Sequence, residues 1–185
     1  MHENELWQEY DVRGERISNG GLKKEDETEN FYGGVAIMLY RYKNGQVEYL
    51  FQKRSEFVSC NANLWDVSAG GHINYDESVL DTAVRESMEE IGAKIEPDRL
   101  EFAASYRALS YLKCDRYIRL YFYDWKEQPS DFHFDDKEVS EVKWVPFDKL
   151  VEFWPELKKP LQDDNIFQTI LLNWTKMIQD KYGNH

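Results

Sequence analysis

One window, from Gly71 to Ala93, limits the fold of this chain more than any other segment. It reads GHINYDESVLDTAVRESMEEIGA and follows the pattern G-x5-E-x7-R-E-x-x-E-E-x-G. Apolar residues recur every three or four positions after Ser78, and Gly92 follows the last of them. The window therefore predicts a helix over about residues 78–91 that begins after a polar loop and ends at a glycine cap.

Three glutamates on this predicted helix point to a metal site. Glu86, Glu89 and Glu90 are spaced three and four positions apart, so a helix places them on one face. Like charges so close together repel one another, and a hard divalent cation that takes oxygen ligands would relieve that repulsion. The spacing predicts that these three carboxylates hold Mg2+, with Mn2+ as an alternative. The other interpretation is a solvated acidic helix face.

The window resembles the Nudix box, and the chain is identified by it as similar to Nudix hydrolases. The resemblance implies that Arg85 pairs with Glu77 and locks the preceding loop onto the helix. It implies an α/β/α sandwich on a mixed sheet. It also implies that either Glu89 or Glu138 serves as general base, because the family does not keep the base at one position. The chain departs from the usual box at Asp76, Ser87 and Ala93, which removes no ligand.

The residues expected to meet the substrate lie before this window or at its start. We expect them to be Lys53, Arg54, Gly70, Gly71 and His72. A guanidinium binds phosphate through two hydrogen bonds, so Arg54 is the strongest of them, although an exposed strand end is the alternative. Surface salt bridges are the expected use of Arg107, Arg116 and Arg119; for Asp135 and Asp136 it is solvation, and for Trp65 a place in the core.

Alternation and turn residues predict the remaining elements. The Asn44-Gly45 pair is typical of a two-residue hairpin. We expect two short strands within 5–18, further strands at 33–43, 46–55, 64–68, 100–109, 115–125 and 141–146, a short helix at 147–153 and an amphipathic helix at 164–182. This order indicates an α/β fold. We divide the chain into an N-terminal arm and linker (1–30) and a Nudix domain (31–175), on which the 164–182 helix packs.

Composition limits the setting in which the chain acts. The net charge is −12, which disfavours binding to nucleic-acid polymers through a basic surface. Two cysteines, Cys60 and Cys114, are too few for a disulfide scaffold. Because neither a signal peptide nor a membrane span is evident in the sequence, we expect a cytoplasmic protein. A small-molecule diphosphate is the expected partner, and a homodimer is compatible with the sequence.

Three functions remain open from the residues. The first is Mg2+-dependent hydrolysis of a nucleoside diphosphate linked to another group, or of a related organic diphosphate. The second follows from the run LWDVSAGGHINYDES, which looks like the isopentenyl-diphosphate isomerase-like branch of the family. The true isomerase needs a cysteine on the first core strand, and residues 31–40, FYGGVAIMLY, contain none. The third is a module that binds a nucleotide or sugar without cleaving it. The identity of the substrate, the general base and the number of metal ions stay undetermined.

Overall fold

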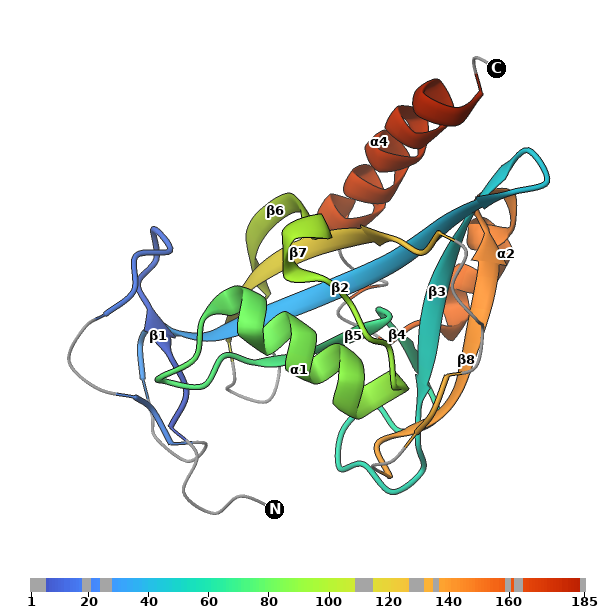
Figure 1. Ribbon diagram of the computed structural model, residues 1–185. Helices are drawn as coiled ribbons and strands as arrows, with labels where there is room; N and C mark the ends of the chain where they lie inside the picture. Colours follow the sequence, from blue (N-terminus) through green and yellow to red (C-terminus); the bar gives the residue numbers. More distant parts are fainter. Residues whose placement is uncertain are drawn as a thin grey trace.

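Strand β2 (Phe31–Lys43) forms the centre of the protein in a computed structural model, as Figure 1 shows. The structure describes residues 6–17, 21–23, 28–108, 115–126, 132–134, 137–158, 161 and 165–183. Strand β2 pairs antiparallel with β1 (Glu9–Tyr10), β3 (Gln46–Arg54) and β5 (Ala69–His72), and parallel with β7 (Arg116–Asp124). The sheet is completed by β4 (Trp65–Asp66), β6 (Glu101–Ala108) and β8 (Val139–Pro146). The predicted mixed sheet is confirmed.

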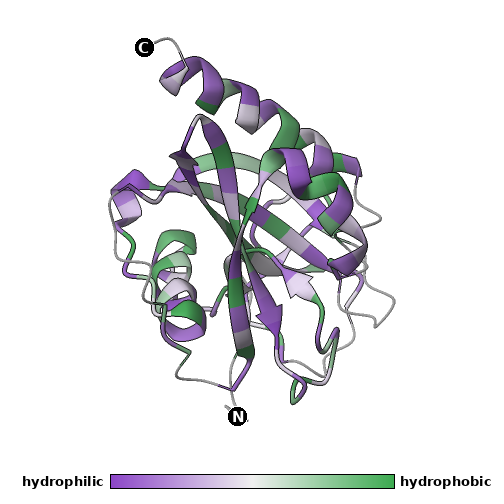
Figure 2. Cartoon of the chain, turned by 90° about the vertical axis from the view of Figure 1, so that its right-hand side faces the viewer, coloured by the Kyte–Doolittle hydropathy of each residue, from purple (hydrophilic) through white to green (hydrophobic). Residues whose placement is uncertain are grey.

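Helices cover both faces of the sheet. Side chains of β2 alternate between two core clusters: Ile37 lies in the cluster under helix α1 (Val79–Ile91), and Met38 lies in the cluster under helix α4 (Asn165–Tyr182). Helix α2 (Leu150–Phe153) contributes to the second cluster, between the 3-10 turns η2 (Phe147–Lys149) and η3 (Trp154–Glu156), while η1 (Pro97–Arg99) follows α1. The side view in Figure 2 shows α1 and α4 on opposite sides of the sheet. Burial on both faces explains why β2 is apolar over most of its length.

Strands β2 and β3 separate where the segment that carries β4 and β5 enters the sheet. The β2–β3 hairpin turns at Asn44 and Gly45, whose φ angles of 53° and 79° suit the predicted two-residue turn. Beyond the pairs near that turn the two strands separate, so that β4 pairs with β3 and β5 pairs with β2. Residues 65–72 thereby pass between β2 and β3 and lead directly into the loop before α1.

Two expectations about strands need correction. Within residues 6–17 the structure has β1 and isolated bridges in place of two short strands. The Asp11 side chain accepts hydrogen bonds from the N–H groups of Arg13 and Glu15, which closes a tight turn there. Strand β5 was not predicted, because Gly70 and Gly71 have weak strand propensity; pairing with β2 imposes the extended form. Among the described residues, no helix is long and apolar enough to cross a membrane.

Candidate active site

Helix α1 begins and ends as the sequence predicts. Ser78 is the N-cap, and its hydroxyl oxygen accepts a hydrogen bond from the N–H of Asp81 at 3.1 Å. Gly92 adopts a left-handed conformation with φ of 65°, and its N–H donates to the Met88 carbonyl at 3.0 Å. A residue with a Cβ would be strained in that conformation. These two caps fix the length of the helix and hence the positions of the glutamates along it.

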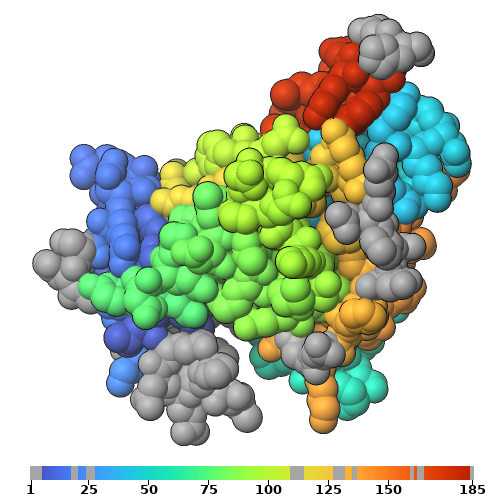
Figure 3. Space-filling model, viewed as in Figure 1, coloured from blue at the N-terminus to red at the C-terminus, as the bar shows by residue number. Residues whose placement is uncertain are grey.

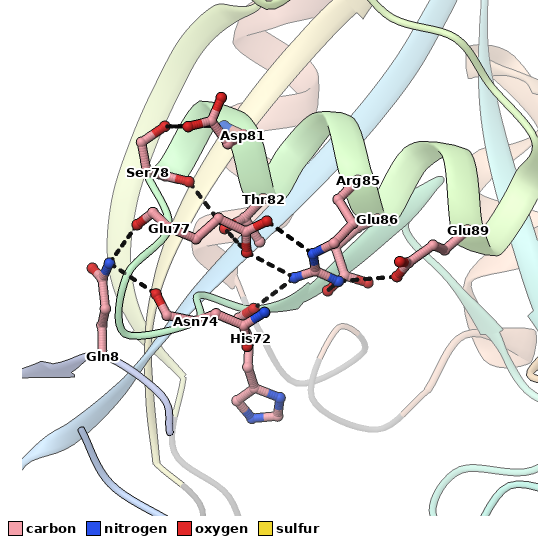
Figure 4. Close-up of polar contacts among 10 residues, drawn as sticks. All are labelled: Gln8, His72, Asn74, Glu77, Ser78, Asp81, Thr82, Arg85, Glu86 and Glu89. Carbon is pink, nitrogen blue, oxygen red and sulfur yellow. Dashed lines mark hydrogen bonds and ion pairs between the residues drawn. The ribbon is translucent and has the colours of Figure 1, made fainter. Parts of the chain in front are cut away.

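Arg85 holds the loop before the helix through Glu77, as Figure 4 shows. Its Nε lies 2.9 Å from Oε1 of Glu77 and its Nη2 lies 3.0 Å from Oε2, which is a two-pronged ion pair. The Thr82 hydroxyl also donates to Oε2 of Glu77 at 2.9 Å. Burial by itself would raise the pKa of Glu77, but the hydrogen bonds from Arg85 and Thr82 outweigh burial and hold that pKa below its usual value. The pairing that the Nudix resemblance implied is therefore present.

The same guanidinium also bridges two of the predicted metal ligands. Nη1 of Arg85 lies 2.8 Å from Oε1 of Glu86 and 3.0 Å from Oε2 of Glu89. These two carboxylates therefore already converge on one positive group. The Glu86 side chain is only 13% exposed, whereas that of Glu89 is 53% exposed. Burial raises the pKa of Glu86 to about 7, although the charge of Arg85 acts in the opposite direction.

Glu90 points away from that bridge into the protein. Its Oε2 accepts hydrogen bonds from the N–H of Gly70 at 2.8 Å and from Nε2 of Gln52 at 2.9 Å. Glu90 is 5% exposed, and this burial raises its pKa well above the usual value. A carboxylate kept in such a place suggests a function, because a buried charge is costly unless a cation or hydrogen bonds compensate it.

The three carboxylates suit a hard divalent cation, but their oxygens do not surround a single point. Carboxylate oxygens are the ligands that Mg2+ prefers, and Glu86 and Glu89 accept a positive group between them. In the part of the chain that the structure describes, no group of three acidic, histidine or cysteine side chains is arranged to hold a metal ion. The reason is local: Arg85 engages Glu86 and Glu89, while Gly70 and Gln52 engage Glu90. All three glutamates could share one ion only if some of these contacts were exchanged.

The two glycines before the helix have steric tasks in the site. A Cβ at Gly71 would lie 2.1 Å from Oε1 of Glu86, so only glycine allows this carboxylate to approach the strand. Gly70 is closed in by the backbone of β2, with the Val35 carbonyl oxygen 2.6 Å from where a Cβ would lie. These positions were predicted to contact substrate. Their clearest structural roles are to let Glu86 come close to β5, for Gly71, and to let β5 pack against β2, for Gly70.

A cluster of cations surrounds Asp66 beside the glutamates. Nη1 of Arg54 lies 3.9 Å from Oδ2 of Asp66, and Nζ of Lys158 lies 2.5 Å from the same oxygen. Asp66 is 4% exposed, and burial lowers the pKa of Lys158. Lys53, predicted with Arg54, lies 5.9 Å from the centre of the Trp65 ring. Two basic side chains thus lie beside a single carboxylate.

The other predicted residues lie at the edges of this region. His72 stacks on Trp7, with ring centres 3.7 Å apart, and its carbonyl accepts from Nη2 of Arg85 at 3.4 Å. The carbonyl of Glu138 accepts a hydrogen bond from the N–H of Ser55 at 2.8 Å. This bond ties Glu138, which is exposed, to the end of β3. Trp65 is buried in the core, as expected. Asp135, Asp136 and Cys114 lie outside the described residues.

Two of the three arginines on the later strands contact aromatic rings. The guanidinium carbon of Arg119 lies 4.2 Å from the centre of the Tyr10 ring, and that of Arg107 lies 6.0 Å from the centre of the Phe31 ring. Arg116 pairs with Tyr32 in the β2–β7 register. No ion pair with an acidic side chain is found for these three arginines among the described residues, in contrast to the surface salt bridges expected.

Sequence patterns missed three residues that the structure brings to the site: Gln8, Gln52 and Lys158. Gln8 contacts the loop before α1, Gln52 donates to Glu90 and Lys158 pairs with Asp66. Each is a single polar residue in a segment without a motif, so spacing alone could not reveal it. For Gln52 a weak signal existed, because it is a polar residue directly after the apolar run Tyr49-Leu50-Phe51 on β3.

Comparison with known proteins identifies relatives over most of the chain. A family model described as NUDIX domain matches residues 5–169. An isopentenyl-diphosphate Delta-isomerase of Jannaschia sp. is 29% identical over 156 residues, which cover 77% of this chain and 84% of that protein. An uncharacterized Nudix hydrolase of Clostridium acetobutylicum is 27% identical over 143 residues, covering 75% and 69%. A shorter match, 34% over 67 residues, links 36% of the chain to 21% of an m7GpppN-mRNA hydrolase of Danio rerio.

Solved structures show the same fold. The crystal structure of DR0079 from Deinococcus radiodurans superposes with a TM-score of 0.66 at 21% identity, covering 86% of this chain and 96% of that one. At this identity the likeness establishes the architecture only. The α/β fold with a mixed sheet, predicted from the order of elements, is confirmed.

Proposed function

Because the chain belongs to the NUDIX domain family and is a Nudix hydrolase, we propose that it cleaves the diphosphate bond of a nucleoside diphosphate linked to another group, or of a related organic diphosphate. Mg2+ is the proposed cofactor, and Mn2+ would substitute for it. The observation that carries this proposal is the intact junction of Glu77, Arg85 and Glu86 at the start of α1. The substrate is proposed from the chemistry of the site, since fold alone does not decide it.

The glutamates of α1 would hold the cofactor. Glu86, Glu89 and Glu90 supply hard oxygen ligands, and the cation they bind would neutralise charge on the diphosphate. Arg54 and Lys53, with Lys158 beside them, would bind the phosphate oxygens from the other side. Gly70, Gly71 and His72 would line the path of the substrate next to β5. Water then attacks one phosphorus, the bridging P–O bond breaks, and the leaving phosphate takes the electron pair.

The proton of the attacking water goes to a carboxylate base. Glu89 is the more accessible of the helix glutamates, with 53% of its side chain exposed. Glu138 comes from the segment tied to the end of β3. Either residue could act as base, and separate Glu89→Gln and Glu138→Gln variants would decide between them. The variant that loses the acidic limb of the pH–rate profile, where protonation of the base slows the reaction, but keeps its affinity for Mn2+ identifies the base.

An activity screen tests the function. Purified protein is incubated with Mg2+ and a panel of nucleoside diphosphate derivatives and prenyl diphosphates, with Glu90→Gln in parallel. Release of phosphorylated products by the wild type, lost in the variant, supports the hydrolase and names its substrate class. Compounds that raise the melting temperature without turnover would favour a binding module instead. Near-normal turnover by Glu90→Gln would overturn the metal assignment.

An isomerase is the second candidate, because the Jannaschia relative is 29% identical over most of its length. The residues argue against it. Strand β2 carries no cysteine, and Cys60 lies in the loop after β3. Conversion of a prenyl diphosphate with the diphosphate retained, followed by NMR, would establish the isomerase and overturn the hydrolase.

The proposed setting follows from the same reading. The partner is a small diphosphate compound rather than a nucleic-acid polymer, the compartment is the cytoplasm, and a homodimer is one of the oligomeric states open to the chain. Light scattering on the purified protein measures the mass in solution and tests the last of these directly.

A further inference from the structure

The N-terminal arm lies against the loop that carries Glu77. Here "arm" means residues 6–17 and "box loop" means residues 72–77. We propose that the arm, through Gln8, is a positioning element that holds the box loop, and with it the Glu77–Arg85 pair, in the geometry needed for catalysis. This inference rests on the proposed function. The space-filling view in Figure 3 shows the arm, in blue, beside the green segment that leads into α1.

Backbone hydrogen bonds seat the arm between the box loop and the start of β2. The N–H of Gln8 donates to the Ile73 carbonyl at 2.8 Å, and the N–H of Tyr75 donates to the Leu6 carbonyl at 2.8 Å. On the other side, the N–H of Gly33 donates to the Gln8 carbonyl at 2.7 Å. The arm thus connects the box loop to the central strand β2 through backbone hydrogen bonds on both of its sides.

The side chain of Gln8 makes the most specific contact. Gln8 is 3% exposed, and the hydroxyl of Tyr10 donates to its Oε1 at 2.5 Å. This bond leaves Nε2 directed toward the box loop. Nε2 donates to the Glu77 carbonyl at 2.6 Å and to the Asn74 carbonyl at 3.1 Å. An amide nitrogen has two hydrogens, so both can be used on the two ends of one short loop.

Ring contacts strengthen the same attachment. Trp7 stacks on His72 with an angle of 6° between the ring planes. Tyr32 packs edge-on against Trp7, with the two ring centres 5.4 Å apart. Trp7 is 8% exposed, so the stack is buried. Because the carbonyl of His72 also accepts from Arg85, the arm contacts both residues that join the box loop to the arginine.

The box loop is therefore held from two sides. Arg85 binds the Glu77 side chain from the helix, and Gln8 binds the Glu77 carbonyl from the arm, as the close-up in Figure 4 shows. If the arm contact is lost, Glu77 gains freedom and Arg85 loses the anchor that sets its distance from Glu86 and Glu89. Gln8 is 69 residues from Glu77 in sequence and contacts none of the proposed metal ligands. It is a positioning residue rather than a catalytic one.

The substitution Gln8→Met tests this role, because methionine has similar length and no hydrogen-bond donor. Hydrogen exchange is followed in peptides covering the box loop, together with Mn2+ affinity and the kcat and KM of the hydrolysis. We expect exchange of the box loop to rise about tenfold. We expect kcat to fall about 10- to 100-fold, as is common when a supporting contact of a metal site is removed, with a smaller change in KM.

Two controls separate positioning from a general loss of stability. Gln179→Met makes the same chemical change at an exposed position of α4 and should leave every readout unchanged. Phe167→Leu loosens the buried core on the opposite face of the sheet and should lower the melting temperature without altering box-loop exchange or kcat. Tyr10→Phe, which frees Oε1 of Gln8, should move the readouts in the same direction as Gln8→Met, but less.

The outcomes distinguish this inference from the proposed function. Box-loop exchange in Gln8→Met equal to that of the wild type would overturn the inference, even if the enzyme is an active hydrolase. The same conclusion follows if Phe167→Leu lowers kcat as much as Gln8→Met does. Faster box-loop exchange and weaker Mn2+ binding in Gln8→Met would support the inference even if no substrate in the panel is cleaved.

Discussion

At the scale of single residues, Glu90 is a buried carboxylate whose charge opposes folding. Its carboxylate lies inside the protein, Gly70 and Gln52 are its hydrogen-bond donors among the described residues, and burial opposes its charge. An apolar side chain of the same size would pack there without this cost. A residue that opposes folding and still occupies the helix face toward β5 is best explained by the ion that we propose it binds.

The substitution Glu90→Gln should separate activity from stability. The amide oxygen of glutamine can still accept from Gly70 and Gln52, while the buried charge disappears. We expect the free energy of unfolding in denaturant to stay equal or rise, while Mg2+-dependent turnover falls more than about 100-fold because a ligand is lost. A variant that is inactive because it is unfolded would contradict this account. Glu152→Gln, at an exposed position of α2, is the control.

Ser87 offers a second test, in which function should not change. It is fully buried on α1, and among the described residues its hydroxyl has no hydrogen-bond partner. Alanine removes that hydroxyl and has a higher helix propensity. We expect Ser87→Ala to raise the free energy of unfolding by about 1 kcal/mol, measured by urea denaturation, with unchanged kcat. A lower stability would mean that the hydroxyl has a partner after all.

At the scale of elements, the junction between the box loop and α1 depends on one ion pair. The pKa of Glu77 is lowered from its usual 4.5, so the pair stabilises the fold fully above that pH and loses its effect as the pH falls through the lower, folded-state pKa. We expect Glu77→Gln to be less stable than the wild type by about 1–2 kcal/mol at pH 7. The difference should shrink below about pH 4.5, as protonation of Glu77 removes the same charge from the wild type.

Denaturation curves of both proteins from pH 3 to pH 7 measure this difference directly. Thr82→Val serves as a comparison, because it removes one neutral donor to Glu77 and keeps the charges. A gap between wild type and Glu77→Gln that is independent of pH would show that the ion pair does not stabilise the junction.

Sequence reasoning predicted elements well where local chemistry decides them. Gly92 capped α1 as expected, the helix began within one residue of the predicted start, and Asn44 with Gly45 formed the hairpin turn. It failed where distant partners decide. Strand β5 contains two glycines and is extended because it pairs with β2, and the arm folds onto the box loop rather than into its own strand pair.

In the site, too, sequence reasoning predicted the contacts within one segment and missed those between distant segments. Glu77 and Arg85 are eight residues apart, at the junction of the box loop and α1, and their pairing was implied by the Nudix box. Gln52, Lys158 and Gln8 reach the site from separate segments, and no spacing rule links them to it. The separation of Glu90 from Glu86 and Glu89 was also unforeseen, because helix geometry gives the shared face but not the partners that each side chain finds.

At the scale of the whole molecule, α4 stabilises the sheet from the face opposite the site. Phe167, Leu171 and Ile178 are buried in the core cluster under α4, and the hydroxyl of Tyr182 donates to Oδ2 of Asp124. Figure 1 shows this helix well away from the arm and the box loop. The core under α4 and the proposed catalytic site thus lie on different faces of one sheet.

Truncation of this core should therefore affect stability alone. Phe167→Ala should lower the free energy of unfolding by about 3–5 kcal/mol, because it removes a fully buried ring and leaves a cavity. Calorimetry measures the loss, and kcat of the protein that remains folded should match the wild type at low temperature. The exposed neighbour Gln168→Ala is the control. A fall in kcat without a fall in stability would show that α4 takes part in catalysis.

The parallel pairing of β2 with β7 has a consequence for the order of folding. Each residue of β2 in this ladder meets a partner 84 positions later, as in Tyr32 with Arg116 (116 − 32 = 84). Contacts of such long range form slowly, because a large loop must close before they contribute. Until β7 arrives, one edge of the most apolar strand stays open to other chains. We therefore expect slow refolding, with losses to aggregation that grow with protein concentration and fall when the denaturant is removed from dilute solution.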